Sequence, residues 1–203
     1  MIDKFQNIKE NANKRKVVDA GKSLFFRYGY RKVTIEEVCR EAGVSKMTYY
    51  KFFGNKLELV RFIIMEIAEA GFQIYRDIMA REVPFEEKIR DTIRMKQDAA
   101  AQYSEEFLKD VYGDKKGEII PQLQKISAEA MKMVMDDYRQ AQEQGYIRKD
   151  LNLAFIPYIL NRISEMVNDP ALLAIYGDMH SIMREVTNLF FYGITSITGK
   201  KEE

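Results

Sequence analysis

Cysteine and histidine are almost missing from this chain of 203 residues, and their scarcity excludes several kinds of chemistry. Cys39 is the only cysteine, so no disulfide can form within one chain, which suits a reducing cytoplasm. His180 is the only histidine, which excludes a helical di-iron site built from paired Glu-x-x-His motifs. A Cys/His nucleophile pair would have to join residues of two different predicted domains. The sequence therefore predicts no metal site and no enzyme.

Long apolar runs and nucleotide-binding glycine patterns are also missing. The longest apolar candidate, residues 153–160, is far shorter than the roughly 20 residues that cross a bilayer. The N-terminus shows no apolar segment of the secretory type, and no Walker A or dinucleotide-binding pattern occurs. The chain has only four prolines and no low-complexity linker, and its composition is 46% hydrophobic and 31% charged. These features favour an all-α cytoplasmic protein with no membrane segment and no bound cofactor.

Residues 34–56 carry the strongest pattern in the chain. Thr34 can cap a first helix, and Glu37 stands three residues later, which completes a capping box. Gly43 tolerates the positive φ needed where this helix ends, and Ser45 can cap the next helix. Two short helices joined by a tight, glycine-containing turn are typical of a helix-turn-helix, which places one helix in the major groove of DNA.

The second helix of this motif has residues that suit DNA. Its spacing puts Val44, Tyr49 and Phe53 on the inner side and leaves lysines, a methionine and a tyrosine outside. Lysines and hydroxyls suit phosphates, and a methionine can contact a thymine methyl group. The alternative is a structural hairpin in an ordinary helical protein, which would gain little from exposing a methionine and a tyrosine.

The first part of the chain is basic, although the whole chain is nearly neutral. Residues 1–56 carry 13 Lys/Arg and 6 Asp/Glu, a net charge of +7, while the remaining residues carry a net charge of −6. A basic N-terminal part (residues 1–56, called the head) attached to a remainder that does not bind nucleic acid (residues 57–203, called the body) is typical of a nucleic-acid-binding module.

A third helix completes this head. It is expected to end at Gly29, because apolar residues recur three and four apart at Val17, Val18, Gly21, Leu24, Phe25 and Tyr28. Asn55 and Glu58 form another cap pattern, with Lys56 in the first turn of a long helix, where phosphate is attracted. Residues 1–12 lack an apolar stripe and form either a frayed, disordered terminus or a basic arm for the minor groove.

The rest of the chain has the apolar spacing of helices throughout. Six are predicted, at about 57–80, 84–103, 104–113, 118–144, 152–168 and 179–197. The predicted architecture is therefore all-α, with a three-helix domain over residues 1–56 and a six-helix domain over residues 57–203. Pro157 would lie inside one of these helices, where it would free the carbonyl of Leu153 and could kink the chain.

From Lys16 to about Leu59 the chain resembles the N-terminal domain of the TetR family of bacterial transcription regulators. The matching positions are Ala20, Leu24-Phe25, Gly29-Tyr30, Thr34, Ala42-Gly43-Val44-Ser45, Tyr50, Phe53 and Asn55-Lys56. This chain has Cys39 where alanine is usual, Tyr49 where an aliphatic residue is common and Gly54 where proline is common. The resemblance implies that the second hairpin helix reads the major groove of a near-palindromic operator in double-stranded DNA.

Carried over position by position, the resemblance also assigns individual DNA contacts. Lys46 and Met47 would face bases, and the positions after them would contact phosphates or base edges. Thr34 and Lys56 would bind phosphate from the starts of the two flanking helices. The predicted DNA-binding residues are Thr34, Ser45, Lys46, Met47, Thr48, Tyr50, Lys51 and Lys56.

The same resemblance implies a homodimer. The last two helices would form a four-helix interface with their copies, because symmetric half-sites require two heads. The predicted interface stripe is Ile182, Val186, Leu189, Phe190, Gly193 and Ile197. The alternative is that this stripe packs within the chain.

A small-molecule effector is implied as well, bound among the helices of the body. Methionine adapts to irregular shapes and tyrosine offers an apolar wall with a polar tip. The candidate residues are Tyr103, Phe107, Met131, Met135, Tyr158, Arg162 and Met166. Such residues at helical spacing also form ordinary core, and Arg162 either anchors an anion or pairs with a carboxylate, so both interpretations stay open.

The predicted function is therefore that of a dimeric, ligand-responsive regulator, most often a repressor in this family. An effector would favour a spacing of the two heads that cannot span both half-sites, which shifts the population away from DNA. The alternative function is a helical protein-interaction module whose hairpin no longer binds DNA.

Overall fold

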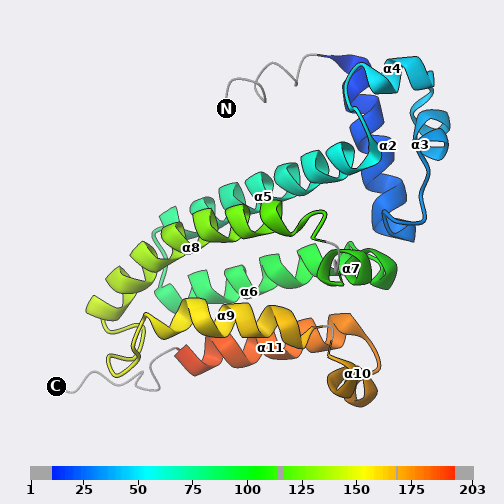
Figure 1. Cartoon of the computed structure of the whole chain (residues 1–203). Helices are drawn as coiled ribbons and strands as arrows, with labels where there is room; N and C mark the ends of the chain where they lie inside the picture. Colours follow the sequence, from blue (N-terminus) through cyan, green and yellow to red (C-terminus); the bar gives the residue numbers. More distant parts are fainter. Residues whose placement is uncertain (1–10, 114–116, 168, 195–203) are drawn as a thin grey trace. The chain divides into compact units, whose positions relative to one another are not determined.

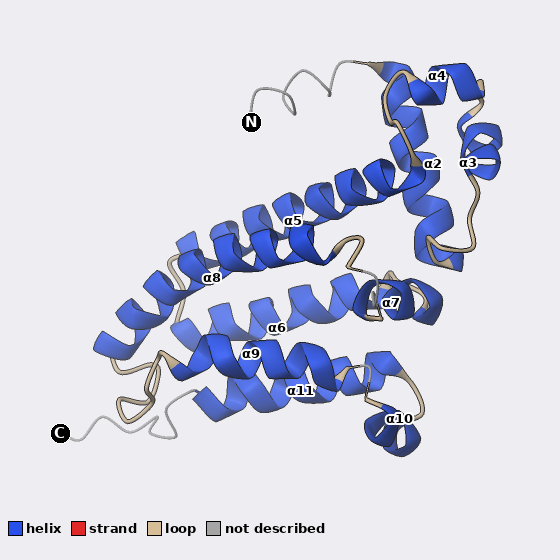
Figure 2. Cartoon of the chain, viewed as in Figure 1, coloured by secondary structure: helices blue, strands red, loops and turns tan. Residues whose placement is uncertain are grey.

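The structure is a computed structural model that describes residues 11–113, 117–167 and 169–194 (Figure 1). The elements in this part of the chain are ten α-helices, α2 to α11 (Figure 2). The all-α prediction is confirmed, with one helix more than the nine expected. Among the described helices, none combines the length and the apolar character that crossing a membrane requires.

The helices form two compact units. The first comprises Met1–Ala68 and Tyr103–Gln122, and the second comprises Glu69–Gln102 and Leu123–Glu203. The first unit contains α2 (Ala12–Tyr28), α3 (Ile35–Ala42), α4 (Lys46–Tyr50) and α7 (Glu105–Tyr112), while α5 (Lys56–Ala80) and α8 (Ile120–Glu143) contribute to both units. This division differs from the predicted boundary after residue 56, because α7 packs on α2.

The second unit is built on α11 (Met179–Ile194). Both α6 (Phe85–Ala101) and α10 (Pro170–Tyr176) pack on α11, and α9 (Phe155–Met166) joins the same core. The buried residues of this core are Phe85, Ile89, Ile93, Tyr138, Ala141, Ile147, Leu151, Ile156, Phe190, Phe191 and Ile194.

The helix that the sequence analysis did not predict is α10. Asp169 caps it, with a carboxylate oxygen that accepts the Ala171 amide at 2.7 Å, and Pro170 occupies its first position. Gly177 ends it with a φ of 81°. The helix has seven residues, too few to show an apolar period.

Pro157 does not interrupt a helix. Helix α9 begins at Phe155 rather than near residue 152, so Pro157 lies in its first turn, where no intrahelical hydrogen bond needs a donor. The carbonyl of Leu153, expected to be free, accepts the amide of Ile156 at 3.0 Å. Pro157 therefore lies in a helix as expected, but in its first turn and not in its interior, and the expected free carbonyl of Leu153 does not arise.

Candidate nucleic-acid interface

A small core lies beneath the hairpin in the first unit. Val17, Val18 and Phe25 of α2 are almost completely buried, and so are Val38 of α3 and Tyr49 of α4. Helix α2 packs on both α3 and α4. The burial of apolar side chains from three helices fixes α4 against the rest of the head.

The caps of the hairpin have the predicted geometry. Thr34 Oγ1 accepts the Glu37 amide at 3.2 Å, and the Glu37 carboxylate accepts the Thr34 amide at 2.7 Å. This hydrogen bond lowers the pKa of Glu37. Gly43 ends α3 in the left-handed conformation with a φ of 63°, and Ser45 Oγ accepts the Thr48 amide at 3.1 Å. The local sequence thus determines where α3 ends and where α4 begins.

Helix α4 turns one side to solvent. Met47 is 75% exposed and Tyr50 is 52% exposed, and Lys46 and Lys51 are exposed beside them. Tyr49 points the other way: it is fully buried, and its hydroxyl donates to the Asn55 carbonyl at 3.2 Å. Burial raises the pKa of the Tyr49 phenol. The predicted division of this helix into an inner and an outer side is confirmed.

An ion pair links α4 to α3. Lys46 pairs with Glu36, and more than half of each side chain is exposed. Their hydrogen bond raises the pKa of Lys46 and lowers the pKa of Glu36. Exposed ion pairs contribute little to stability, so Lys46 can exchange this partner for a phosphate or a base at small cost. No sequence pattern pointed to the pair, because its two residues meet only through the folded hairpin.

Lys56 makes a contact that the sequence analysis missed. Its ammonium donates to the carbonyl of Arg31 at 3.0 Å and to the carbonyl of Val33 at 2.8 Å. Burial lowers the pKa of Lys56. An ammonium has three hydrogens, so one remains for a phosphate oxygen. Lys56 therefore holds the turn before α3, and its phosphate contact stays a prediction.

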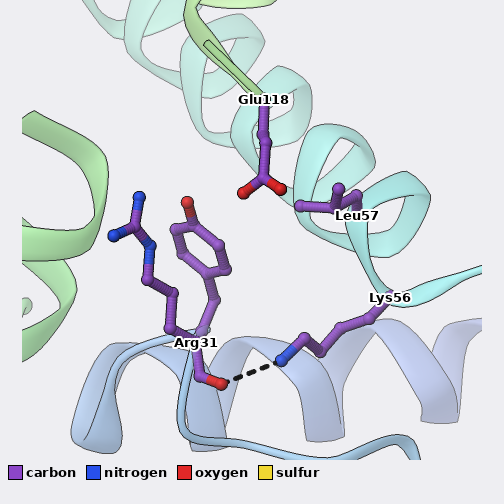
Figure 3. A pocket seen from close by; sticks show the side chains of 5 residues that line it. Arg31, Lys56, Leu57 and Glu118 are labelled. Carbon is purple, nitrogen blue, oxygen red and sulfur yellow. Dashed lines mark hydrogen bonds between the residues drawn. The ribbon is translucent and has the colours of Figure 1, made fainter. Parts of the chain in front are cut away.

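A pocket of about 410 Å³ lies beside this turn (Figure 3). Figure 3 shows Lys56 reaching from the start of α5 to the main chain of Arg31, with Glu118 coming from a separate segment. The guanidinium of Arg61 on α5 donates to the Glu118 carbonyl at 2.7 Å, which ties that segment to α5. The lining carries charges of both signs and consists of Tyr30, Arg31, Lys56, Leu57 and Glu118.

One lysine of the basic head faces inward. Lys14 is buried, and its ammonium lies 5.1 Å and 4.7 Å from the ring centres of Phe53 and Phe62. Burial lowers the pKa of Lys14, while the nearby Glu66 carboxylate opposes this effect. The cation–π contacts join α2 to α5 and to the segment after α4. The net charge of the head therefore overstates the charge that faces outward.

The structure divides the predicted dimer stripe into two sets. Ile182, Val186 and Phe190 are buried within the chain, whereas Leu189 is 70% exposed and Gly193 is exposed too. Ile197 lies outside the described residues. Three further large side chains that the prediction omitted are more than half exposed: Tyr192 on α11, and Phe155 and Tyr158 on α9.

The predicted effector residues are distributed over both units. Tyr103 and Phe107 belong to the first unit, where their rings lie 4.8 Å and 5.2 Å from that of Phe26. In the second unit, Met131 and Met166 are partly buried, Met135 packs on the core, and Tyr158 is exposed. Arg162 is exposed and pairs with Glu165 at 2.6 Å, which favours the carboxylate alternative over the anion anchor.

The N-terminal part of the chain matches a known family. Residues 17–62 match the model of the bacterial regulatory proteins of the tetR family. An uncharacterised HTH-type transcriptional regulator of Bacillus subtilis (strain 168), YhgD, is 32% identical over 76 residues. The matched segment is 37% of this chain and 40% of that protein, so the chain spans about two fifths of this curated relative.

Solved structures share the fold along nearly the whole chain. The fatty acid degradation regulator FadR of Bacillus halodurans is 16% identical, with a TM-score of 0.68 over 91% of this chain and 97% of its own. The regulatory protein TetR of Rhodobacter sphaeroides is 15% identical, with a TM-score of 0.67 over 92% of this chain and 100% of its own.

A third structure is that of a Saccharomonospora viridis protein in complex with choline. It is 15% identical, with a TM-score of 0.68 over 90% of this chain and 97% of its own. Sequence identities this low show a shared fold and nothing further. The match to a family model comes from residues 17–62. The N-terminal part of the chain thus matches the model of the tetR family, and nearly the whole chain shares its fold with TetR of Rhodobacter sphaeroides.

Proposed function

We propose that this protein is a dimeric transcription regulator that binds a near-palindromic operator and is released from it by a small-molecule effector, as a repressor. The exposed side of α4 is the observation that carries this proposal. It combines the apolar Met47 and the aromatic Tyr50 with two exposed lysines, and the buried Tyr49 anchors the helix from behind. Such a surface suits base edges and phosphates. A regulator of this kind works in the compartment that contains the DNA, which agrees with the predicted cytoplasmic location.

The capped starts of α3 and α4 support phosphate contacts. The Thr34 hydroxyl donates to the Glu37 carboxylate at 2.9 Å, and the Ser45 hydroxyl lies 3.0 Å from that of Thr48. Both capping residues are exposed. A phosphate oxygen can therefore replace Glu37 as the acceptor for Thr34 without removing the main-chain cap, whose acceptor is the threonine oxygen itself.

The exposed apolar residues of α9 and α11 support a homodimer. Leu189, Tyr192, Phe155 and Tyr158 are all more than half exposed, and both helices contribute to one core. Exposed apolar side chains that lie together mark interaction surfaces, and the rings of Phe155 and Tyr158 lie 5.9 Å apart. Two heads are needed for two half-sites, so a second copy of the chain is the occupant that the function requires.

The second unit is the proposed place of the effector. The Saccharomonospora viridis protein, which has the same fold, was solved in complex with choline, and this ligand is a property of that protein. In this chain the partly buried Met131, Met135 and Met166 remain the candidates for contacts with an apolar part of a ligand.

The proposed function is tested by titrating the purified protein with DNA that flanks its own gene and with a scrambled duplex, each at two salt concentrations. Preferential binding with two protomers per site is expected, with an affinity that falls steeply with salt because phosphate contacts release counterions. A full absence of DNA binding at low salt would favour the protein-interaction module instead.

A further inference from the structure

The turn between α2 and α3 is held from two sides at a single residue. The main-chain amide of Arg31 donates to Asp110 Oδ2 on α7 at 2.9 Å. The carbonyl of the same residue accepts the ammonium of Lys56 on α5 at 3.0 Å (Figure 3). Both polar groups of the Arg31 main chain are thus bound by charged side chains, and such hydrogen bonds are stronger than neutral ones.

Helix α7 is fitted closely to the end of α2. The amide of Ser104, which caps α7, donates to the carbonyl of Phe26 at 2.8 Å. Gly29, with a φ of 80°, faces α7 so closely that a Cβ atom there would lie 2.7 Å from Asp110 Oδ2. The same Cβ would lie 3.2 Å from the carbonyl carbon of Glu106. Any side chain at position 29 would therefore push α7 away from the turn.

Asp110 has further contacts with the same turn. Its carboxylate lies 3.7 Å from Arg31 Nε, and its side chain is only 16% exposed. Its own carbonyl accepts the hydroxyl of Tyr30 at 3.4 Å. The carboxylate thus reaches both the main chain and the side chain of Arg31, while Lys56 also holds the carbonyl of Val33, just before the α3 cap.

We propose that Asp110 is a positioning residue for DNA binding, which sets the place of Thr34 and of the start of α3 by holding the Arg31 amide. This inference rests on the proposed function. Residue 31 is three residues from Thr34, and Lys56 binds the carbonyls of Arg31 and Val33, so Asp110 and Lys56 hold this turn from two different helices.

The test uses three variants of the full-length protein. Asp110→Ala removes the acceptor, and Asp110→Asn keeps an acceptor oxygen but removes the charge. Glu106→Gln is the matched control, because it removes one negative charge from an exposed residue of the same helix, one turn earlier, whose carboxylate is not the acceptor of the Arg31 amide. The two readouts are operator affinity and the hydrogen exchange of the Arg31 amide, with the amide of the buried Ile63, in the interior of α5, as an internal reference.

Asp110→Ala is expected to weaken operator binding about tenfold, the usual effect of losing one charge-assisted hydrogen bond. The Arg31 amide should exchange faster while the Ile63 amide stays protected. Asp110→Asn should give an intermediate effect on both readouts, and Glu106→Gln should change neither. If Asp110→Ala does not fold, the same comparison is made between Asp110→Asn and Glu106→Gln.

Unchanged operator affinity in the Asp110 variants would overturn the positioning role, even if the Arg31 amide exchanged faster. An equal loss in Glu106→Gln would also overturn it, because the effect would then come from the charge of α7. A wild-type protein that binds no duplex would overturn the proposed function together with the positioning role, and this outcome is distinct from a variant that binds as well as the wild type.

Discussion

The hydroxyl of Tyr49, on the helix proposed to enter the major groove, donates to the carbonyl of Asn55, just before α5 begins, at 3.2 Å. Tyr49 is fully buried, and its ring lies 5.8 Å from that of Phe53. The residue that replaces the usual aliphatic side chain thus adds a polar link from α4 to the segment that leads into α5.

We expect Tyr49→Phe to lower the free energy of unfolding by about 1 kcal/mol, because it removes one partly buried hydrogen bond and keeps the ring. Urea unfolding measures this change. Tyr50→Phe is the control: Tyr50 is half exposed, so its loss of a hydroxyl should stay within about 0.5 kcal/mol of the wild type. Equal stabilities of both variants would show that the Asn55 contact does not stabilise the head.

Different exposed residues of α4 and its C-terminal end should affect different properties of DNA binding, namely the base preference and the overall affinity. Met47→Ala should reduce the discrimination at one base pair of each half-site, where a mismatch usually costs about 1–3 kcal/mol. Lys51→Ala should instead weaken binding to all sequences alike and reduce the salt slope by about one per protomer. Binding to a set of single-base operator variants at two salt concentrations measures both effects. An unchanged base preference in Met47→Ala would remove this residue from the readout.

Glu37 should make the head sensitive to acid. Its folded-state pKa lies below the ordinary value because its carboxylate accepts the Thr34 amide, so its contribution to stability is present above that ordinary value. It is lost as the pH falls through the folded-state pKa. Between about pH 6 and pH 3, the wild type should therefore lose more stability than Glu37→Gln does. Urea unfolding of both proteins at each pH gives the comparison, and parallel losses would contradict it.

The exposed face of α11 should control the oligomeric state. Leu189→Glu places a charge on the proposed dimer interface and should give a folded monomer, because Leu189 is 70% exposed within the chain. Ile175→Glu on α10 is the matched control, since Ile175 is 73% exposed and lies outside the proposed interface. Sedimentation velocity and operator affinity should change only in the first variant. If Leu189→Glu remained a dimer, the dimer interface would have to lie on another part of the chain.

The hairpin could be predicted well because its signals are local. Thr34, Gly43 and Ser45 act on groups within four residues of themselves, and the structure shows each at the expected helix end. The match of residues 17–62 to a family of regulatory proteins also agrees with the prediction that the chain is not an enzyme. These inferences needed no knowledge of how distant segments meet.

Contacts between distant segments could not be predicted in the same way. Periodicity placed Ile182, Val186 and Phe190 on an apolar stripe but could not tell whether the chain itself or a second copy covers it, and in the structure they are buried within the chain. The contacts of Lys56 and Asp110 with the turn join residues 23 to 79 positions apart. Helix α10 was missed for a different reason, its short length.

The buried ammonium of Lys14 has a consequence for chemical labelling. Lysine-reactive reagents modify side chains that solvent reaches, so Lys16 and Lys51 should be labelled readily in the native protein. Lys14 lies against Phe53 and Phe62 and becomes accessible only when α2 separates from them. The rate at which Lys14 is modified should therefore measure how often α2 separates from these two rings, and no added label is needed.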